Sequence, residues 1–503
     1  GAAPSAPTVP SGRADGPRSP ARGEASGGQD PGDRPEGAGA SAAKKAADRL
    51  AGIDVARGLA VLGMFVVHVG LGWTLADGSN ALYGLVSGRS AALFALLAGV
   101  SIALLSGGPT PRTGHDMGVA LWRVVIRGLI MLPVGTLLTM TGTPVSVILA
   151  YYAVFFVLAA PLMSERWKIV AGTAAVLGVL GPVVSFYVRG LMAEGGPLRG
   201  PVAAVNSYDP LVALADDGVV NFLVTGAYPA ITWMPFVFAG MAIGRLRLRR
   251  RAVQWSLVGV GAGLAAVAYT ASWAALALGG RARLEASFDA EVMERYGGAS
   301  SVAEALREGF PGTVPVNDWA WLLVSSGHSG TPFEVFGAGG IAIAVLGLCL
   351  IVAPYLRWAV YPLAAVGALA LTTYVGHVLV IWLAESGLVD GTPLGFVSDR
   401  LDLTVLLGAL VFATVWRLLV RRGPLEWPLH VVSMWAAKRI PWGVRARRCG
   451  PGGVGGAGRG ALAPLLRVRG CGPLPCPGGG AARAWSNSGG RGVRKRPGSV
   501  WWA

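Results

Sequence analysis

The sequence has few charged residues for its length. Asp, Glu, Lys and Arg make up 14% of its 503 residues, whereas a soluble globular domain carries about 25%. Together with 53% hydrophobic residues, this shortage excludes a water-exposed surface for most of the chain. The formal net charge of +16 lies largely in the two tails and in short loops. We therefore expect no basic face for binding nucleic acid.

Cysteines and common catalytic motifs are also scarce. Cys349 lies in an apolar run, and Cys449, Cys471 and Cys476 lie in the C-terminal tail. No Cys/His pair has zinc-ligand spacing inside a structured region, so we expect no metal site. The sequence contains no Walker A, GxSxG or HExxH pattern, which excludes the enzyme classes that depend on those motifs.

Long apolar runs dominate what remains. A membrane-spanning helix needs about 20 mostly apolar residues, and the sequence predicts ten such spans, with a multi-pass all-α bundle as the fold class. Pro229 and Pro235 interrupt the sixth span. The ten expected spans are 54–75, 84–106, 119–139, 144–163, 168–188, 221–244, 252–278, 333–354, 360–384 and 402–420.

The charges of the loops indicate an orientation. With the N-terminus in the cytoplasm, the short outer loops 76–83 and 140–143 contain no Lys or Arg. Basic residues instead occur in alternate loops, as the positive-inside rule requires, and the C-terminus is then also cytoplasmic. The basic residues on the expected inner side are Arg112, Arg166, Lys168, Arg245, Arg247, Arg249, Arg250, Arg251, Arg357, Arg421, Arg422, Lys438 and Arg439.

Composition divides the chain into three parts. Residues 1–45 have no apolar signal-peptide core and are expected to form a disordered cytoplasmic lead. Residues 46–440 form the expected membrane domain, with long outer loops at 189–220 and 279–332. Residues 441–503 are rich in Gly, Arg and Pro, without periodicity, and are expected to be a disordered cytoplasmic tail.

The first expected span carries three ionisable residues, which are costly in a bilayer and therefore functional candidates. Asp54 and Arg57 are three residues apart, so they share one face of the helix near its cytoplasmic end. His68 returns to that face about 16 Å nearer the outside. The Asp54–Arg57 pair is either part of a ligand site or an anchor at the headgroups. His68 is either functional or a structural hydrogen-bonding residue.

Three histidines fall at one expected depth, near the outer face. His377 lies in the outer half of the ninth span, and His328 lies just before the eighth span, at the same level as His68. A histidine cluster beside water suits proton transfer, because the histidine pKa lies near neutrality. The other interpretation is three unrelated interfacial histidines. Arg89 begins the second span on the same side, whereas His115 and His430 are expected in solvated cytoplasmic loops.

Two arginines share one face of the inner half of the third span. Arg123 and Arg127 are four residues apart and, if buried, need anions. Asp54 is a candidate partner for one of them, and a phosphate-bearing ligand entering from the cytoplasm is a candidate for the rest. The alternative is that both side chains extend to the lipid headgroups.

Several segments resemble a known bacterial family. The opening RLAGIDVARGLAVLGMFVVHVG, with Arg49, Asp54, Arg57 and Gly58, resembles the first helix of YeiB-like proteins, the domain-of-unknown-function 418 family. It also resembles the related heparan-α-glucosaminide N-acetyltransferase catalytic domain. Further stretches follow in the same order, and the resemblance covers about residues 46–440. These are GRSAALFALLAGVSIAL, YPAITWMPFVFAGMAIGRL, HSGTPFEVFGAGGIAIAVLGLCL, ALALTTYVGHVLVIW and the closing RRGPLEWPLH.

The resemblance implies a transmembrane acyltransferase-like fold. Characterised relatives bind acyl-CoA from the cytoplasm and pass the acyl group to a hydroxyl or amine, often of a sugar, on the far side, with a histidine as base or acyl carrier. The heparan enzyme has its histidine in the loop after the first helix. Here that loop, GWTLADGSNALYG, contains none, and His68 stands where those enzymes tend to have Asn.

We therefore expect a plasma-membrane enzyme that moves an acyl group, acetyl in the first instance, from acetyl-CoA to an envelope glycan or lipid-linked acceptor. Arg57, Arg123 and Arg127 would hold the donor phosphates, with Asp54 beside them. His68 or His377 would deprotonate the acceptor, and Arg89 or His328 would stabilise the oxyanion. The alternatives are a transporter or lipid-handling protein, whose charges line a substrate path, and a non-catalytic scaffold or receptor.

Overall fold

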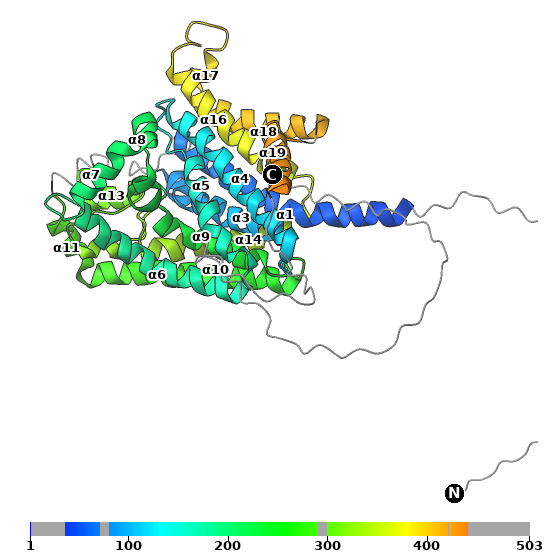
Figure 1. The fold of residues 1–503 in the computed structure, drawn as a ribbon, viewed down its shortest axis with the longest axis horizontal. Helices are drawn as coiled ribbons and strands as arrows, with labels where there is room; N and C mark the ends of the chain where they lie inside the picture. Colours follow the sequence, from blue (N-terminus) through cyan, green and yellow to red (C-terminus); the bar gives the residue numbers. More distant parts are fainter. Residues whose placement is uncertain (2–35, 71–79, 290–298, 421, 441–503) are drawn as a thin grey trace, which may run out of the picture. The chain divides into compact units, whose positions relative to one another are not determined.

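The computed structural model describes residues 1, 36–70, 80–289, 299–420 and 422–440. Within these ranges the regular elements are helices, drawn along the chain in Figure 1. The prediction of an all-helical fold is confirmed. The chain divides into the units Gly1–Ala46 and Ala47–Ala503, and the second contains every candidate site residue.

In the part of the chain that the structure describes, eleven α-helices exceed ten residues. They are α1 (Glu36–Val69), α3 (Arg89–Leu105), α4 (Gly114–Thr139), α5 (Leu149–Ala159), α6 (Trp167–Met192), α9 (Ala230–Gly244), α10 (Arg251–Ala275), α14 (Pro332–Val352), α16 (Ala370–Glu385), α18 (Leu401–Leu419) and α19 (Glu426–Arg439). The shorter elements are α2 (Ala81–Val86), η1 (Ala160–Ser164), α7 (Arg199–Tyr208), α8 (Pro210–Ala215), η2 (Asn221–Thr225), η3 (Leu276–Gly280), α11 (Arg281–Ala286), α13 (Val302–Glu308), η4 (Trp319–Leu323), α15 (Tyr361–Ala368) and α17 (Phe396–Asp399).

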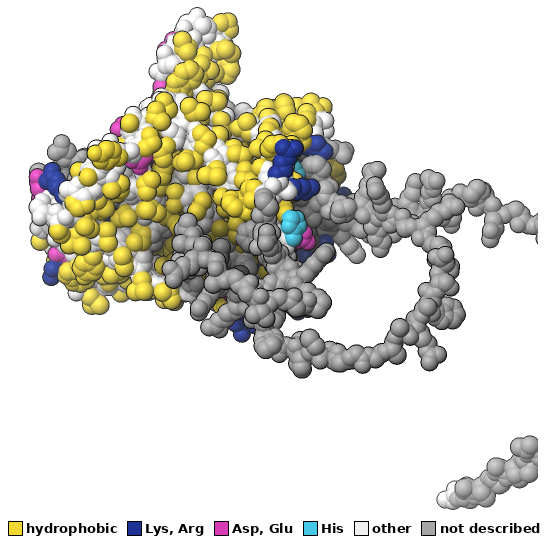
Figure 2. Space-filling view, viewed as in Figure 1, with side chains coloured by type: hydrophobic (Ala, Val, Ile, Leu, Met, Phe, Trp, Pro, Cys, Tyr) yellow, Lys and Arg dark blue, Asp and Glu magenta, His cyan; other side chains and the backbone are white. Residues whose placement is uncertain are grey.

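Seven helices in the described part of the chain are long and apolar enough to cross a membrane. The bent pair α15 and α16 makes an eighth candidate, and two apolar helices are shorter, at Leu149–Ser164 and Ala230–Gly244. Each expected span overlaps one of these elements, although the count of ten and the topology stay predictions. Hydrophobic side chains cover most of the face seen in Figure 2, as a lipid-facing surface requires. The chain has the character of a multi-pass helical membrane protein. The seven candidates are Ala51–Val69, Ala81–Leu105, Gly114–Thr139, Trp167–Met192, Arg251–Ala286, Pro332–Val352 and Leu401–Leu419.

Three boundaries differ from the sequence prediction. Helix α1 begins at Glu36, inside the segment 1–45 that we expected to be disordered. The expected span 221–244 contains a break, because Pro229, with its φ restricted by the ring, is the N-cap of α9. The expected span 360–384 divides into α15 and α16, which meet at 84°. The expected tail 441–503 lies outside the described residues.

The long helices pack in close pairs. Helix α10 lies against α14, and α9 lies against both α3 and α6. Small residues permit these approaches. Among the C-terminal helices, α18 contacts α15 and α16, and α19 contacts α4. These helices therefore surround the bend between α15 and α16 (Figure 1).

Part of the expected outer loop 279–332 forms a small core of its own. Trp321 is fully buried, and Phe310 packs edge-on against it. The short helices α11 and α13 contribute Leu284 and Val302 to this cluster.

Helices α1 and α15 cross at two glycines. A Cβ on Gly58 would overlap the carbonyl oxygen of Leu363, and one on Gly367 would overlap that of Asp54. The backbones therefore touch directly, which places the charged face of α1 against the end of α15.

We predict that Gly367→Ala destabilises the protein by at least about 2 kcal/mol, because the added methyl forces two backbones apart. The matched control is Gly376→Ala in α16, where a Cβ meets nothing within 4 Å; it should be neutral or slightly stabilising. Thermal unfolding of both variants in detergent provides the measurement. Equal midpoints for the two variants would show that the close crossing is not needed.

Candidate functional site

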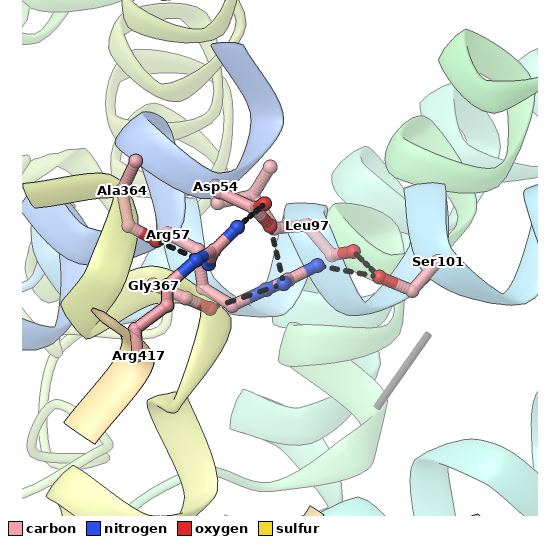
Figure 3. Close-up of polar contacts among 7 residues, drawn as sticks. All are labelled: Asp54, Arg57, Leu97, Ser101, Ala364, Gly367 and Arg417. Atoms are coloured by element: carbon pink, nitrogen blue, oxygen red, sulfur yellow. Dashed lines mark hydrogen bonds and ion pairs between the residues drawn. The ribbon is translucent and has the colours of Figure 1, made fainter. Parts of the chain in front are cut away.

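A buried ion pair forms the centre of the candidate site. Arg57 donates to Asp54 Oδ1 at 3.3 Å and to Ser101 Oγ at 3.0 Å. Arg417 approaches the other oxygen of Asp54 at 3.9 Å. Figure 3 shows the carboxylate of Asp54 facing both guanidinium groups. One carboxylate therefore compensates two cations, and the sequence prediction that Asp54 partners Arg123 or Arg127 is wrong.

The same two arginines bind the end of α15. Arg57 donates to the carbonyl of Gly367 at 3.2 Å, and Arg417 donates to that of Ala364 at 3.1 Å (Figure 3). The last carbonyls of a helix lack intrahelical partners and lie at the negative end of the helix dipole. Arg57 therefore satisfies a carbonyl that the break leaves open, and Arg417 adds a second cation near the same end of the helix.

A carboxylate binds the exposed backbone amide at the start of α16. The buried Glu426 accepts hydrogen bonds from the backbone N–H of Thr372 at 2.9 Å and from its hydroxyl at 2.6 Å. An anion at a helix N-terminus is stabilised by the exposed amides and the dipole. The bend thus has cations at its carbonyl end and a carboxylate at its amide end, which is how a helix can break inside an apolar environment.

The bend borders a cavity of about 100 Å³ that is partly open to the outside. The lining is apolar except for a few groups. It consists of Arg57, Phe94, Ala98, Ser101, Ile102, Leu105, Val124, Arg127, Met131, Leu149, Tyr152, Phe156, Gly367, Ala368, Ala370, Leu371, Tyr374 and Leu429.

Two tyrosines of the lining differ in their bonding. The hydroxyl of Tyr374 accepts from the backbone N–H of Ile148 at 3.2 Å. The hydroxyl of Tyr152 is buried and has no hydrogen-bond partner among the described residues. A buried polar group without a partner is costly, so the Tyr152 hydroxyl marks a position where a ligand atom would be favourable.

The arginines of α4 face α19. Arg123 Nη2 lies 2.9 Å from Nδ1 of His430, and Arg127 Nε donates to Ser433 Oγ at 3.4 Å. His430 is therefore a half-buried helical residue, and the prediction of a solvated loop histidine is wrong for it. His115 is exposed, as predicted, although it lies in the first turn of α4 and not in a loop. Both arginines are buried, so extension to the headgroups does not describe them.

The two histidines of the expected spans meet. His68 Nδ1 lies 3.0 Å from His377 Nε2, and the rings are nearly parallel, at 9°. His377 is buried, stacks on Phe65 at 4.2 Å and directs its Nδ1 to the carbonyl of Tyr374. His68 is half-buried. Side chains 309 residues apart thus form a directly bonded pair with one accessible member.

The other two predicted residues lie nearby. His328 acts electrostatically on His68, and its ring stacks on Trp233 at 5.6 Å. Its backbone N–H donates to the buried Glu334, which also interacts electrostatically with Arg89. Arg89 itself donates to the hydroxyl of Tyr269 at 3.1 Å and to the carbonyl of Gly84.

Tyr374 connects the histidine pair to the cavity. Its side chain lines the cavity, and its carbonyl accepts the hydrogen bond of His377 one helical turn away. Arg57 lines the same cavity and precedes His68 on α1 by eleven residues, about 16 Å along the helix axis. A ligand that spans the cavity would therefore lie between the arginines and the histidines.

The sequence analysis missed several residues of this arrangement. Glu426 stands in the quoted closing stretch RRGPLEWPLH, but no role was given to it. Arg417 and Tyr152 occur in apolar runs, where ionisable or phenolic groups were the available signal. Among the described residues, no group of three or more His, Cys, Asp or Glu could hold a metal ion.

We predict that Glu426→Ala lowers the free energy of unfolding by about 2 kcal/mol, because the amide of Thr372 loses a charged acceptor. Glu385→Ala, at the exposed end of α16, should change it by less than about 0.5 kcal/mol. Denaturation in detergent measures both. An unchanged Glu426→Ala would mean that water replaces the carboxylate at no cost.

The loop histidine predicts a pH dependence. Burial lowers the pKa of His328 to about 4, against about 6.5 for an unfolded chain. Below pH 6.5 the unfolded state binds the extra proton, so this contribution to stability is complete above that pH and is lost as the pH falls towards 4, by at most about 1.4 kcal/mol per pH unit.

The test compares the unfolding midpoint from pH 7.5 to 4.5 for the wild type and His328→Asn. Asn tolerates the positive φ of 56° at this position, so the backbone is retained. The variant should show the weaker acid dependence. Parallel curves for the two proteins would assign the acid sensitivity to other groups.

Comparison with known proteins adds one assignment. No curated protein matches the chain. Residues 306–436 match a family described as "Protein of unknown function (DUF418)". The matched region contains the bend, Glu426, Arg417 and two of the three predicted histidines, His328 and His377. This match supports the YeiB-like, DUF418 assignment that the sequence predicted.

Proposed function

We propose that this protein is a membrane-embedded acyltransferase that uses acyl-CoA from the cytoplasm and acylates a glycan or lipid-linked acceptor outside the cytoplasmic membrane. The observation that carries the proposal is the bonded pair His68–His377, which shares Tyr374 with a cavity lined by Arg57 and Arg127. A proton acceptor, connected through Tyr374, and arginines that suit an anion thus both adjoin the same cavity.

The donor would enter at the arginines. Arg123 and Arg127 lie on one face of α4, and Arg57 faces the same region from α1. Guanidinium groups bind phosphate oxygens in pairs of hydrogen bonds, so these side chains suit the phosphates of coenzyme A. Asp54 would hold Arg57 in place and would not contact the donor itself.

Hydrogen bonding supports different roles for the two histidines. A carbonyl oxygen only accepts, so His377 Nδ1 donates to Tyr374 and carries the ring proton. In the neutral ring, Nε2 of His377 then accepts from Nδ1–H of His68. Nε2 of His68 is left with a lone pair, on the more exposed ring. His68 is thus the general base, and His377 is a positioning residue that fixes its tautomer.

These groups account for every proton and bond in the acyl transfer. Nε2 of His68 removes the proton of the acceptor hydroxyl or amine while that oxygen or nitrogen attacks the thioester carbonyl. The tetrahedral intermediate collapses with loss of the coenzyme A thiolate, which takes the proton from His68. Arg89 and His328 are the candidates for oxyanion stabilisation. Each would have to give up a present partner, which is Tyr269 or Gly84 for Arg89 and the backbone of Ala227 for His328.

The test uses full-length protein in proteoliposomes with labelled acyl-CoA. His68→Ala should reduce transfer at least about 100-fold without weakening donor binding, because it removes the base. His377→Gln should reduce kcat and alter its pH profile, because the tautomer is no longer fixed. The control is His115→Ala, at an exposed position. Full transfer by the His68→Ala, His377→Ala double variant would refute the proposal.

One observation favours a second function. A discontinuous helix beside a cavity is typical of transporters, whose half-helix ends face the substrate, and α15–α16 has this form. Substrate movement across vesicles that contain no acyl donor, abolished by Arg127→Ala, would support transport over acyl transfer.

A further inference from the structure

The walls of the cavity are more apolar than a site for an acetyl group and coenzyme A phosphates requires. Helices α3, α4 and α5 contribute side chains of Phe, Ile, Leu, Val and Met along its length. Phe94, Met131 and Phe156 are only half-buried, so apolar surface remains exposed within it. Such surface is favourable when a hydrocarbon covers it.

The polar groups of the cavity are few and mostly engaged. Arg57 and Ser101 bond to each other, and the hydroxyl of Tyr374 bonds to Ile148. Tyr152 is 2% exposed, and its hydroxyl has no hydrogen-bond partner among the described residues. It interacts electrostatically with Arg57. A buried hydroxyl without a described partner, in a largely apolar cavity, suits a ligand with an accepting oxygen and a long chain.

We propose that the cavity binds a medium- or long-chain acyl group, with its carbonyl or carboxyl oxygen at Tyr152 and its chain along Phe94, Ala98 and Phe156. This inference rests on the proposed function in assigning the chain to the donor. It replaces the expectation of an acetyl donor by a fatty-acyl donor. The same chemistry is offered by a free fatty acid, so the experiment includes both ligands.

Binding of acyl-CoA from two to twelve carbons, and of free dodecanoate, is measured on the purified full-length protein. Each buried CH₂ should tighten binding about fourfold until the cavity is filled. Ala98→Phe places a ring in the cavity and should abolish the gain for long chains. Ala262→Phe, at a lipid-facing position of α10, is the matched control, because partition into detergent affects both variants equally.

Tyr152→Phe is an independent variant that adds no volume. It should weaken long-chain binding roughly three- to tenfold, because one hydrogen bond is lost, and leave the unfolding midpoint of the ligand-free protein unchanged or raised. Tyr374→Phe should instead lower that midpoint, because the amide of Ile148 loses its acceptor.

The outcomes separate the two proposals. Chain-length-dependent binding that Ala98→Phe abolishes, without transfer at any length, would support the acyl site and refute the acyltransferase. Transfer of acetyl with binding independent of chain length would refute the acyl site alone. If dodecanoate binds as tightly as dodecanoyl-CoA, the acyl chain alone accounts for the affinity of the cavity. If dodecanoate binds more weakly, the coenzyme A part contributes the difference in affinity.

Discussion

The carboxylate of Asp54 allows two guanidinium groups to remain buried beside the end of α15. Arg57 and Arg417 both face it, and both donate to backbone carbonyls near the end of α15. Removing charges from water is costly unless they are paired and hydrogen-bonded. The three side chains meet this condition jointly, since the acid neutralises the cations and the carbonyls occupy their remaining donors. Glu426 completes the arrangement at the start of α16.

The bend has consequences for every candidate group around it. The cavity lies between the bent pair and α3, α4 and α5. After the bend, α16 presents Tyr374 to the cavity and His377 to His68. The charge pairing at the bend and the position of the histidine pair are thus parts of one structure. This connection makes a donor site and a base on opposite sides of Tyr374 physically reasonable.

The spacing of residues along the sequence was sufficient to predict some of these features. Asp54 and Arg57 pair because three residues bring side chains together on a helix, and the apolar runs predicted most helices. Other expectations failed because a closer partner was present. Arg417 took the place beside Asp54 that was expected for Arg123 or Arg127, and Arg123 contacts His430 on a helix that hydropathy does not reveal. Glu426 was visible in the sequence, but nothing local indicates that it caps a helix 54 residues earlier.

The sequence by itself determined that this chain has the character of a helical membrane protein and that it resembles the DUF418 family, because hydropathy and short motifs are properties of neighbouring residues. The tertiary structure decided the bend, the cavity and the histidine pair. Arg57 and Gly367 are 310 residues apart, and His68 and His377 are 309 apart. Contacts over such separations depend on how whole helices pack, and helix packing is set by close crossings such as Gly58 on α15, whose partners no local pattern specifies.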